Sequence, residues 1–198
     1  HMNHEPVNSN VKSIIAISET LNNYTKERMS YYFKVPTLSR YSNWENGIIA
    51  QQTNNFGSDF VLNSGSFFVE IFKIDEDTSV TEGETGRIVV TDLYNYAMPL
   101  IRYDTGDLGA INTSASTPVL TSIEGRKSDV IYDTKGDIVS SLFMGSIIKY
   151  PGIIQAQLIQ TSAKHYLLKL NSTDSFNNKI LLIKELKSYL GEDADITV

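Results

Sequence analysis

The sequence predicts an α+β fold in two domains, and three observations lead to this prediction. Residues 66–74 alternate between two faces with period two, as strands do. Several short strand-like runs follow one another over residues 59–124 without helices between them. From residue 128 onwards, strand and helix patterns alternate. We therefore expect a partial α/β sheet with a small β-barrel subdomain, followed by a small split βαβ domain.

The N-terminal region has the pattern of a strand followed by a helix. Residues 11–17 form an apolar run of strand length, and Asn22 or Asn23 could cap a helix after it. Residues 34–38 predict a second short strand, and residues 41–47 predict a polar loop behind that strand. Ligands of open α/β sheets usually sit at the carboxyl ends of strands, so this loop is a candidate ligand loop.

A domain boundary is expected near Ser128. The part before it, residues 1–127, would contain the α/β piece at 11–58 and the barrel-like piece at 59–124. In the barrel-like piece, strand patterns occupy residues 66–74, 87–93, 100–103 and 119–123, and Thr105-Gly106-Asp107 is expected to turn the chain.

The small domain, residues 128–198, has the order strand, helix, strand, strand, helix, strand, which is the βαββαβ arrangement. Two short strands flank a Lys135-Gly136 turn at its start. The later elements are a helix at 140–150, strands at 154–158 and 166–170, a helix through Ile183 and Leu190 that ends at Gly191, and a strand at 196–198.

Composition excludes several classes of partner. The formal net charge of -6 offers no basic surface for nucleic acid or for an anionic membrane, so neither partner is expected. The chain has no cysteine, which rules out disulfides and thiolate metal sites and suits a reducing compartment. Since no signal peptide and no apolar run of membrane-spanning length is present, we expect a cytoplasmic protein.

Four motifs in order resemble the adenylate-forming (acyl-CoA synthetase, AMP-binding) superfamily. The longest covers residues 83–107, where Gly-Glu-Thr-Gly-Arg leads to Pro-Leu-Ile-Arg-Tyr-Asp-Thr-Gly-Asp, wording typical of the phenylacetate-CoA ligase and CapK branch. Residues 125–131 are similar to that family's hinge motif, and residues 17–21 and 41–45 resemble two further family motifs. The resemblance runs from about residue 11 to residue 198 and corresponds to the C-terminal half of a family member.

The resemblance implies three nucleotide contacts. Asp107 corresponds to the aspartate whose carboxylate accepts hydrogen bonds from both ribose hydroxyls, and its alternative is a turn residue bonding its own backbone. Arg126 corresponds to the arginine that approaches ribose and phosphate; the alternative is a surface arginine at a domain edge. Tyr41 corresponds to the aromatic residue that stacks on adenine, with a packed tyrosine as the alternative.

The candidate ligand loop also carries the implied metal ligand. Glu45 corresponds to the family glutamate that binds Mg²⁺, a cation that prefers carboxylate and phosphate oxygens. Trp44 stands where the family usually has Ser or Thr, and an indole N–H, unlike a hydroxyl, cannot accept a hydrogen bond. Ser42 stands where glycine is usual, so the loop is expected to have an altered shape.

Two further pairs of residues take their roles from the resemblance. Ser18 and Glu19 are expected at the wall of the acyl or adenine pocket. Ser128 or Asp129 would be the hinge of a mobile small domain, although the family often has an acidic residue at the position of Ser128.

The implied parent is an ATP-dependent, AMP-forming ligase that joins a small carboxylic acid to a thiol, with ATP, AMP, Mg²⁺ and CoA as its cofactors. The family's phosphate loop has no counterpart here, and its catalytic lysine would lie downstream of Val198. We therefore expect a truncated ligase that is inactive alone and self-associates through exposed core surface. Two alternatives stay open: a non-catalytic nucleotide- or partner-binding module, and a synthetase that acylates a protein or a capsule polysaccharide precursor.

Overall fold

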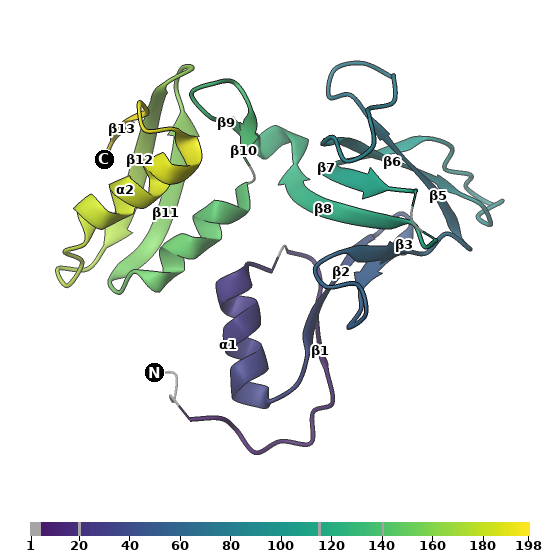
Figure 1. Cartoon of the computed structure of the whole chain (residues 1–198), viewed down its shortest axis with the longest axis horizontal. Helices are drawn as coiled ribbons and strands as arrows, with labels where there is room; N and C mark the ends of the chain where they lie inside the picture. The colour runs from purple at the N-terminus through teal and green to yellow at the C-terminus, as the bar shows by residue number, and fades with distance from the viewer. Residues whose placement is uncertain (1–4, 20, 115, 140) are drawn as a thin grey trace. The chain divides into compact units, whose positions relative to one another are not determined.

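A computed structural model describes residues 5–19, 21–114, 116–139 and 141–198 of the chain (Figure 1). The chain divides into two compact units, with the division between Ser128 and Asp129. The predicted α+β class is confirmed, because mixed sheets dominate and the described residues contain only two α-helices. No helix in this described part has both the length and the apolar character needed to cross a membrane.

The first unit is built on one sheet of eight strands. Their order across the sheet is β1-β2-β3-β4-β8-β7-β6-β5, with β1 and β2 parallel and the other neighbours antiparallel. The strands are β1 (Ile14–Ala16), β2 (Thr37–Asn43), β3 (Gly47–Gln52), β4 (Phe60–Leu62), β5 (Phe67–Phe72), β6 (Gly86–Asp92), β7 (Tyr103–Asn112) and β8 (Val119–Arg126).

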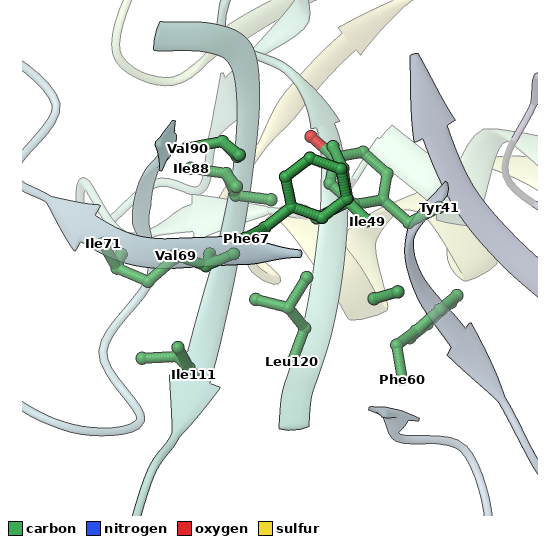
Figure 2. Close-up of a cluster of buried hydrophobic side chains, with 11 residues drawn as sticks. Tyr41, Ile49, Phe60, Phe67, Val69, Ile71, Ile88, Val90, Ile111 and Leu120 are labelled. Carbon is green, nitrogen blue, oxygen red and sulfur yellow. The ribbon is translucent and has the colours of Figure 1, made fainter. Parts of the chain in front are cut away.

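This sheet curls around one hydrophobic core, which gives it a barrel-like shape. Side chains from β2 to β8 all contribute to the same buried cluster, and Figure 2 shows them converging between the strands. Members from distant strands, such as Tyr41 of β2 and Val69 of β5, share this core although β2 and β5 lie far apart in the strand order. Burial of the cluster therefore bends the sheet and brings β2 toward β7.

Helix α1, Asn23–Phe33, lies alongside β1 and β2 (Figure 1). The predicted cap is confirmed, since the Asn22 side chain accepts a hydrogen bond from the backbone N–H of Thr25 at 2.8 Å. The helix is tied to the sheet by Lys26, whose Nζ donates to Oε1 of the buried Gln52 at 2.8 Å.

The loop conformation predicted for residues 41–47 is wrong, because most of these residues are in strands. Strand β2 continues through residue 43, and only residues 44–46 form the turn to β3. The strand buries every second side chain, with Thr37, Ser39 and Tyr41 facing inward. Two of these three are polar, and they hide the apolar alternation on which strand prediction depends.

The predicted strand at residues 100–103 and the predicted turn at 105–107 are also wrong. Residues 93–102 are irregular, and Arg102 has a φ of 51°, which an extended strand cannot contain. Strand β7 begins at Tyr103 and runs through residues 105–107. Strands β3 and β4 were not predicted from the sequence.

The second unit packs one helix on a three-stranded sheet of order β11-β12-β13 (Figure 1). Leu182, Leu186 and Leu190 form the buried stripe of α2, and they contact Tyr166 and Leu168 of β12 within one core. The 3₁₀ helix η1 (Lys127–Asp129) spans the division between the units. The elements that follow it are β9 (Ile131–Tyr132), β10 (Ile138–Val139), η2 (Ser141–Lys149), β11 (Ile153–Gln160), β12 (His165–Ser172), α2 (Lys179–Leu190) and β13 (Asp195–Thr197).

The predicted order of elements is confirmed, with two differences in detail. The expected helix at 140–150 is a 3₁₀ helix, η2, in which Gly145 weakens α-helix formation, and residue 140 lies outside the described residues. The first strand pairs in its own hairpin, β9-β10, instead of joining the sheet. The side-chain amide of Gln160 replaces the missing strand pairing, because it binds both the N–H and the C=O of Tyr132, at 2.9 and 3.1 Å.

Gly109 of β7 provides a test of how tightly the curled sheet is packed. A Cβ at this position would lie 2.6 Å from Ser122 O and 2.9 Å from Ile88 Cδ1. We expect Gly109→Ala to destabilise the protein by about 1–3 kcal/mol through overpacking, measured as a lower urea midpoint of the amide NMR signals of the first unit.

Gly65→Ala is the matched control, because a Cβ there would meet only Asn63 Oδ1, at 3.9 Å. Equal urea midpoints for the two variants would contradict the tight strand contact at Gly109.

Candidate active-site region

A buried cluster of polar groups joins the two strands that the curl of the sheet brings together. The Tyr41 hydroxyl, from β2, donates to Asp107 Oδ2 of β7 at 2.8 Å and also lies 3.1 Å from Thr105 Oγ1. Three strands separate β2 from β7 in the sheet order, so these are contacts across the inside of the curled sheet. The structure thus brings Tyr41 and Asp107 together, although 66 positions separate them in the sequence.

Asp107 projects from a bulge in β7. The β6-β7 register passes from Arg87 opposite Leu108 to Val89 opposite Asp104, so β7 has extra residues here. Three residues of the bulge explain its shape. Asp104 Oδ1 accepts from the Gly106 N–H at 2.9 Å, Thr105 Oγ1 accepts from the Asp107 N–H at 3.2 Å, and Gly106 has a φ of 75°. These side chain–backbone bonds are the ones that Asp and Thr favour in turns, and glycine accommodates the positive φ.

Arg87 on β6 holds the start of this bulge. Its guanidinium contacts Asp104 Oδ2 at 2.5 Å and Asp77 Oδ1 at 2.7 Å. Burial is the largest single influence on the pKa of Asp104 and by itself would raise it. The hydrogen bonds from Arg87 and from the Gly106 N–H, with the charges of Arg87 and Lys127, together outweigh burial and hold the pKa below its ordinary value. Asp104 is therefore an ionised anchor for the bulge.

Arg126 lies opposite Asp107 on the neighbouring strand β8. Its Nε is 3.3 Å from Asp107 Oδ1, and one terminal nitrogen donates to the Thr105 carbonyl at 2.9 Å. The Asp107 side chain is only 13% exposed, whereas that of Arg126 is 60% exposed. The carboxylate is thus sheltered, while the guanidinium beside it reaches solvent.

The electrostatics of the cluster make Tyr41 the proton donor. Burial raises the pKa of the Asp107 carboxyl, against the lowering effects of the Tyr41 hydrogen bond and the Arg126 charge. Burial and the Asp107 charge raise the pKa of the Tyr41 phenol well above its ordinary value. Among the residues that the structure describes, Tyr41 is the donor near Oδ2 of Asp107 and Arg126 is the donor near Oδ1, and a carboxylate oxygen has two lone pairs. Each oxygen retains the capacity to accept one further hydrogen bond.

The Tyr41 ring lies in the hydrophobic core, and its exposed fraction is 8% (Figure 2). This packing favours the alternative of a packed tyrosine over a ring that stacks on adenine. Only the hydroxyl group reaches the polar cluster, where it contacts Asp107 and Thr105.

The β2-β3 turn places Trp44 and Glu45 at the surface. Trp44 is fully exposed, and the Glu45 carboxylate is exposed beside it. The Tyr103 phenol lies next to Glu45 and is hydrogen-bonded to it. Burial raises the pKa of this phenol most, and the charge of Glu45 and the hydrogen bond raise it further. The described residues contain no group of three or more acidic or histidine side chains suited to a metal. A single carboxylate nevertheless fits Mg²⁺ that is shared with nucleotide phosphates and water.

Ser18 and Glu19 lie just after β1, where both are exposed. Strands β1 and β2 are parallel, with Ala16 opposite Ser39, so these two residues are at the same sheet edge as the end of β2. The Glu19 N–H donates to the Ile17 carbonyl at 2.9 Å across Ser18, which has a φ of 75°, as in a strained γ-turn.

The expected hinge residues occupy the division between the two units. Ser128 and Asp129 belong to the short 3₁₀ helix η1, and the division falls between them. Their role as a pivot stays a prediction.

A separate hollow of about 440 Å³ lies between the N-terminal arm and the end of α1. Its lining includes Lys12 and Lys34 but no carboxylate. It therefore offers no carboxylate for a pair of sugar hydroxyls, and its lining shares no residue with the cluster around Asp107.

Sequence reasoning did not assign roles to Arg87, Tyr103, Asp104 or Thr105. The tetrapeptide at residues 104–107 did carry a signal, because Asp, Thr and Gly in succession favour side chain–backbone bonds and a positive φ. Nothing local, however, indicates that the bulge faces Tyr41 or that Arg87 anchors it.

Solved structures with the same fold are adenylate-forming ligases. A 2-hydroxyisobutyryl-CoA ligase in its postadenylation state with 2-HIB-AMP matches with a TM-score of 0.67 and 17% identity, over 88% of this chain and 41% of that protein. The same ligase also matches in an open conformation and in the thioesterification state, with TM-scores of 0.64 and 0.55. An anthranilate CoA ligase with anthranoyl-AMP matches with a TM-score of 0.64 and 14% identity, over 94% and 40% of the two chains.

The predicted resemblance to adenylate-forming ligases of the phenylacetate-CoA ligase type is confirmed by sequence. The phenylacetate-coenzyme A ligase of Escherichia coli (strain K12) is 27% identical over 121 residues, which is 59% of this chain and 26% of that enzyme. No protein-family profile matches the chain. The chain spans about a quarter of this curated relative and about two fifths of the solved ligases.

The raised pKa of Asp107 makes stability depend on pH. Its folded-state pKa lies above the ordinary value of 3.8, so the favourable contribution of the neutral carboxyl is complete below that value and is lost as the pH rises through the folded-state pKa. We expect Asp107→Asn to be more stable than the parent near pH 7, and the difference to shrink as the pH is lowered toward about 4. Urea unfolding over this pH range measures both effects.

Asp75→Asn is the control, since this aspartate of the same unit has an 88% exposed side chain. A variant Asp107→Asn that is less stable than the parent at neutral pH would refute the assignment of a burial cost to this carboxylate.

Proposed function

We propose that this chain is the ribose-binding and hinge portion of an ATP-dependent, carboxylate-activating ligase of the acyl-CoA ligase type. One observation carries the proposal: the sheltered Asp107 carboxylate has one protein donor near each oxygen and can accept one more bond on each. The two adjacent hydroxyls of a ribose supply two donors at the spacing of a carboxylate. Asp107 is the residue that the motif resemblance assigns to this contact.

The neighbouring charges suit the rest of a nucleotide. Arg126 is beside Asp107, and its exposed guanidinium can turn toward a phosphate, which a planar bidentate donor binds well. Glu45 would hold Mg²⁺ together with the phosphates, and the metal would neutralise their charge. Solved relatives of this fold carry acyl-adenylates, 2-HIB-AMP and anthranoyl-AMP, which supports a nucleotide as the ligand.

In the whole protein, the carboxylate of a small acid would attack the α-phosphorus of ATP and release pyrophosphate. The acyl group of the resulting acyl-adenylate would then pass to a thiol such as CoA, with AMP as the leaving group. Rotation of the second unit about Ser128 or Asp129 would separate the two steps. The open, postadenylation and thioesterification states of one solved relative support such a movement.

Several aspects of the parent protein are part of the same proposal. We expect a cytoplasmic location and a small carboxylic acid as substrate, and Ser18 and Glu19 are proposed to border the pocket. Self-association of the 198-residue chain also stays a prediction. The irregular segment 93–102 would contribute to it, since Tyr94, Tyr96 and Ile101 are largely exposed there.

The second candidate function is a nucleotide-binding module without catalysis, and Trp44 favours it. A fully exposed indole occupies the turn where a phosphate-binding hydroxyl would be expected. Binding of AMP by a complete parent protein that never forms pyrophosphate from ATP would support this second candidate.

Nucleotide affinity tests the role of Asp107. We expect the chain to bind AMP, and Asp107→Asn to weaken binding by about tenfold to a hundredfold, because a hydrogen bond to a charged group contributes about 1.5–3 kcal/mol. Arg126→Ala should weaken binding by a similar factor. Isothermal titration calorimetry with AMP gives these affinities.

Two exposed residues outside the cluster supply controls of matched chemistry. Asp75→Asn controls for loss of an acid, and Arg102→Ala controls for loss of an arginine, whose guanidinium binds Glu70 instead. If Asp107→Asn and Arg126→Ala both bind AMP as tightly as the unsubstituted 198-residue chain, the result argues against a ribose site.

Catalysis is expected only from a longer chain. The 198 residues span 41% of the solved 2-hydroxyisobutyryl-CoA ligase. We infer that acid activation also needs groups from the rest of such a protein. We expect no ATP–pyrophosphate exchange by this chain with a panel of carboxylic acids, and exchange with at least one acid by a parent protein of ligase length. Exchange by the 198-residue chain alone would overturn this expectation.

A further inference from the structure

Thr105 has a buried hydroxyl that connects three strands. Its side chain is on β7, and the residue is only 6% exposed. The Oγ1 donates to the Ile88 carbonyl of β6 at 2.9 Å, accepts from the Asp107 N–H at 3.2 Å, and lies 3.1 Å from the Tyr41 hydroxyl of β2. A single oxygen therefore fixes the bulge that presents Asp107 and the phenol that binds it.

We propose that Thr105 is a positioning residue of the ribose site, whose hydroxyl sets the direction in which the Asp107 carboxylate faces the sugar. The inference rests on the proposed function, because it concerns the same carboxylate. Thr105 itself would not touch the nucleotide. It would act through Asp107 and Tyr41.

The Thr105 hydroxyl can orient Asp107 because it binds at the irregular step of the β6-β7 pairing. The register moves from Arg87 opposite Leu108 to Val89 opposite Asp104, so Ile88 lies at the irregular step. The Thr105 O–H binds the Ile88 carbonyl there, and this uses its only proton. The oxygen is left as an acceptor, which is the role that the Asp107 N–H requires. The Tyr41 hydroxyl, whose single proton goes to Asp107 Oδ2, lies 3.1 Å from the same oxygen and packs beside it.

The same geometry limits how the carboxylate can rotate. The Asp107 backbone is held by Thr105, and Oδ2 is held by Tyr41, which itself contacts Thr105. Arg126 then approaches Oδ1 from β8 and donates to the Thr105 carbonyl. Without the hydroxyl, the Ile88 carbonyl loses a buried partner and the bulge can shift, so the two open acceptor positions no longer match the two ribose hydroxyls.

Binding of two nucleotides by the full 198-residue chain isolates this effect. The probes are AMP and 2′,3′-dideoxy-AMP, which lacks both ribose hydroxyls, and the quantity measured is the ratio of their dissociation constants. We expect the unsubstituted 198-residue chain to bind AMP about tenfold or more tightly than 2′,3′-dideoxy-AMP. Thr105→Val, which keeps the shape but removes the hydroxyl, should bring the ratio close to one, while Thr105→Ser should retain most of the preference.

A merely structural role would lower the affinity for both nucleotides and leave the ratio unchanged. If Thr105→Val does not fold, as judged by circular dichroism, Thr105→Ser and Thr105→Ala replace it as a pair that differs only in the hydroxyl. The inference would be overturned, and the ribose site left intact, if Thr105→Val had the same ratio of dissociation constants as the unsubstituted chain. Equal ratios in the Ser and Ala variants would have the same meaning. If the 198-residue chain without substitutions binds both nucleotides equally, or binds neither, the ribose site and the inference are both overturned.

Discussion

The hydrogen bond from Tyr41 to Asp107 depends on the curl of the eight-stranded sheet, and the candidate site depends on that bond. In a flat sheet, β2 and β7 would be separated by the widths of β3, β4 and β8. The shared hydrophobic core bends the sheet until the two strands face each other. Packing of the apolar core thereby positions the polar groups, because it brings the Tyr41 hydroxyl within 2.8 Å of the Asp107 carboxylate.

The cluster holds an acidic side chain, Asp107, at a position where burial disfavours its ionised form. Burial raises the pKa of Asp107, and the nearby Arg126 and Tyr41 offset that effect only in part. A fold selected for stability alone would be better served by a neutral side chain at this position. Such a conflict between local stability and a retained charge is typical of functional sites. It agrees with a carboxylate that is held ready for two external donors.

Much of the fold could be predicted because the decisive signals are local. The Asn22 cap, the alternation along β5 and the leucine stripe of α2 ending at Gly191 all depend on neighbouring residues. The strand predicted at residues 34–38 overlaps only the start of β2, and the continuation of β2 to residue 43 was not predicted. Thr37 and Ser39 are buried polar residues, and their burial depends on tertiary contacts that a local sequence pattern does not contain.

The site divides in the same way between local and distant signals. Asp107 and Arg126 could be chosen from motifs, and the register of β7 against β8 places them opposite each other. The roles of Thr105 and Tyr103 could not be found from the sequence, because they follow from contacts with β2 and with the β2-β3 turn.

The long sequence separation between Tyr41 and Asp107 has a consequence for folding. A contact between distant segments costs more loop-closure entropy than a local contact, so we expect the acceptor geometry to be among the later features to appear. A partly folded chain would present Asp107 as an ordinary exposed aspartate. A ligand that recognises the finished cluster binds the folded, curled sheet and not its unfolded precursors, so its binding would stabilise the fold of this unit.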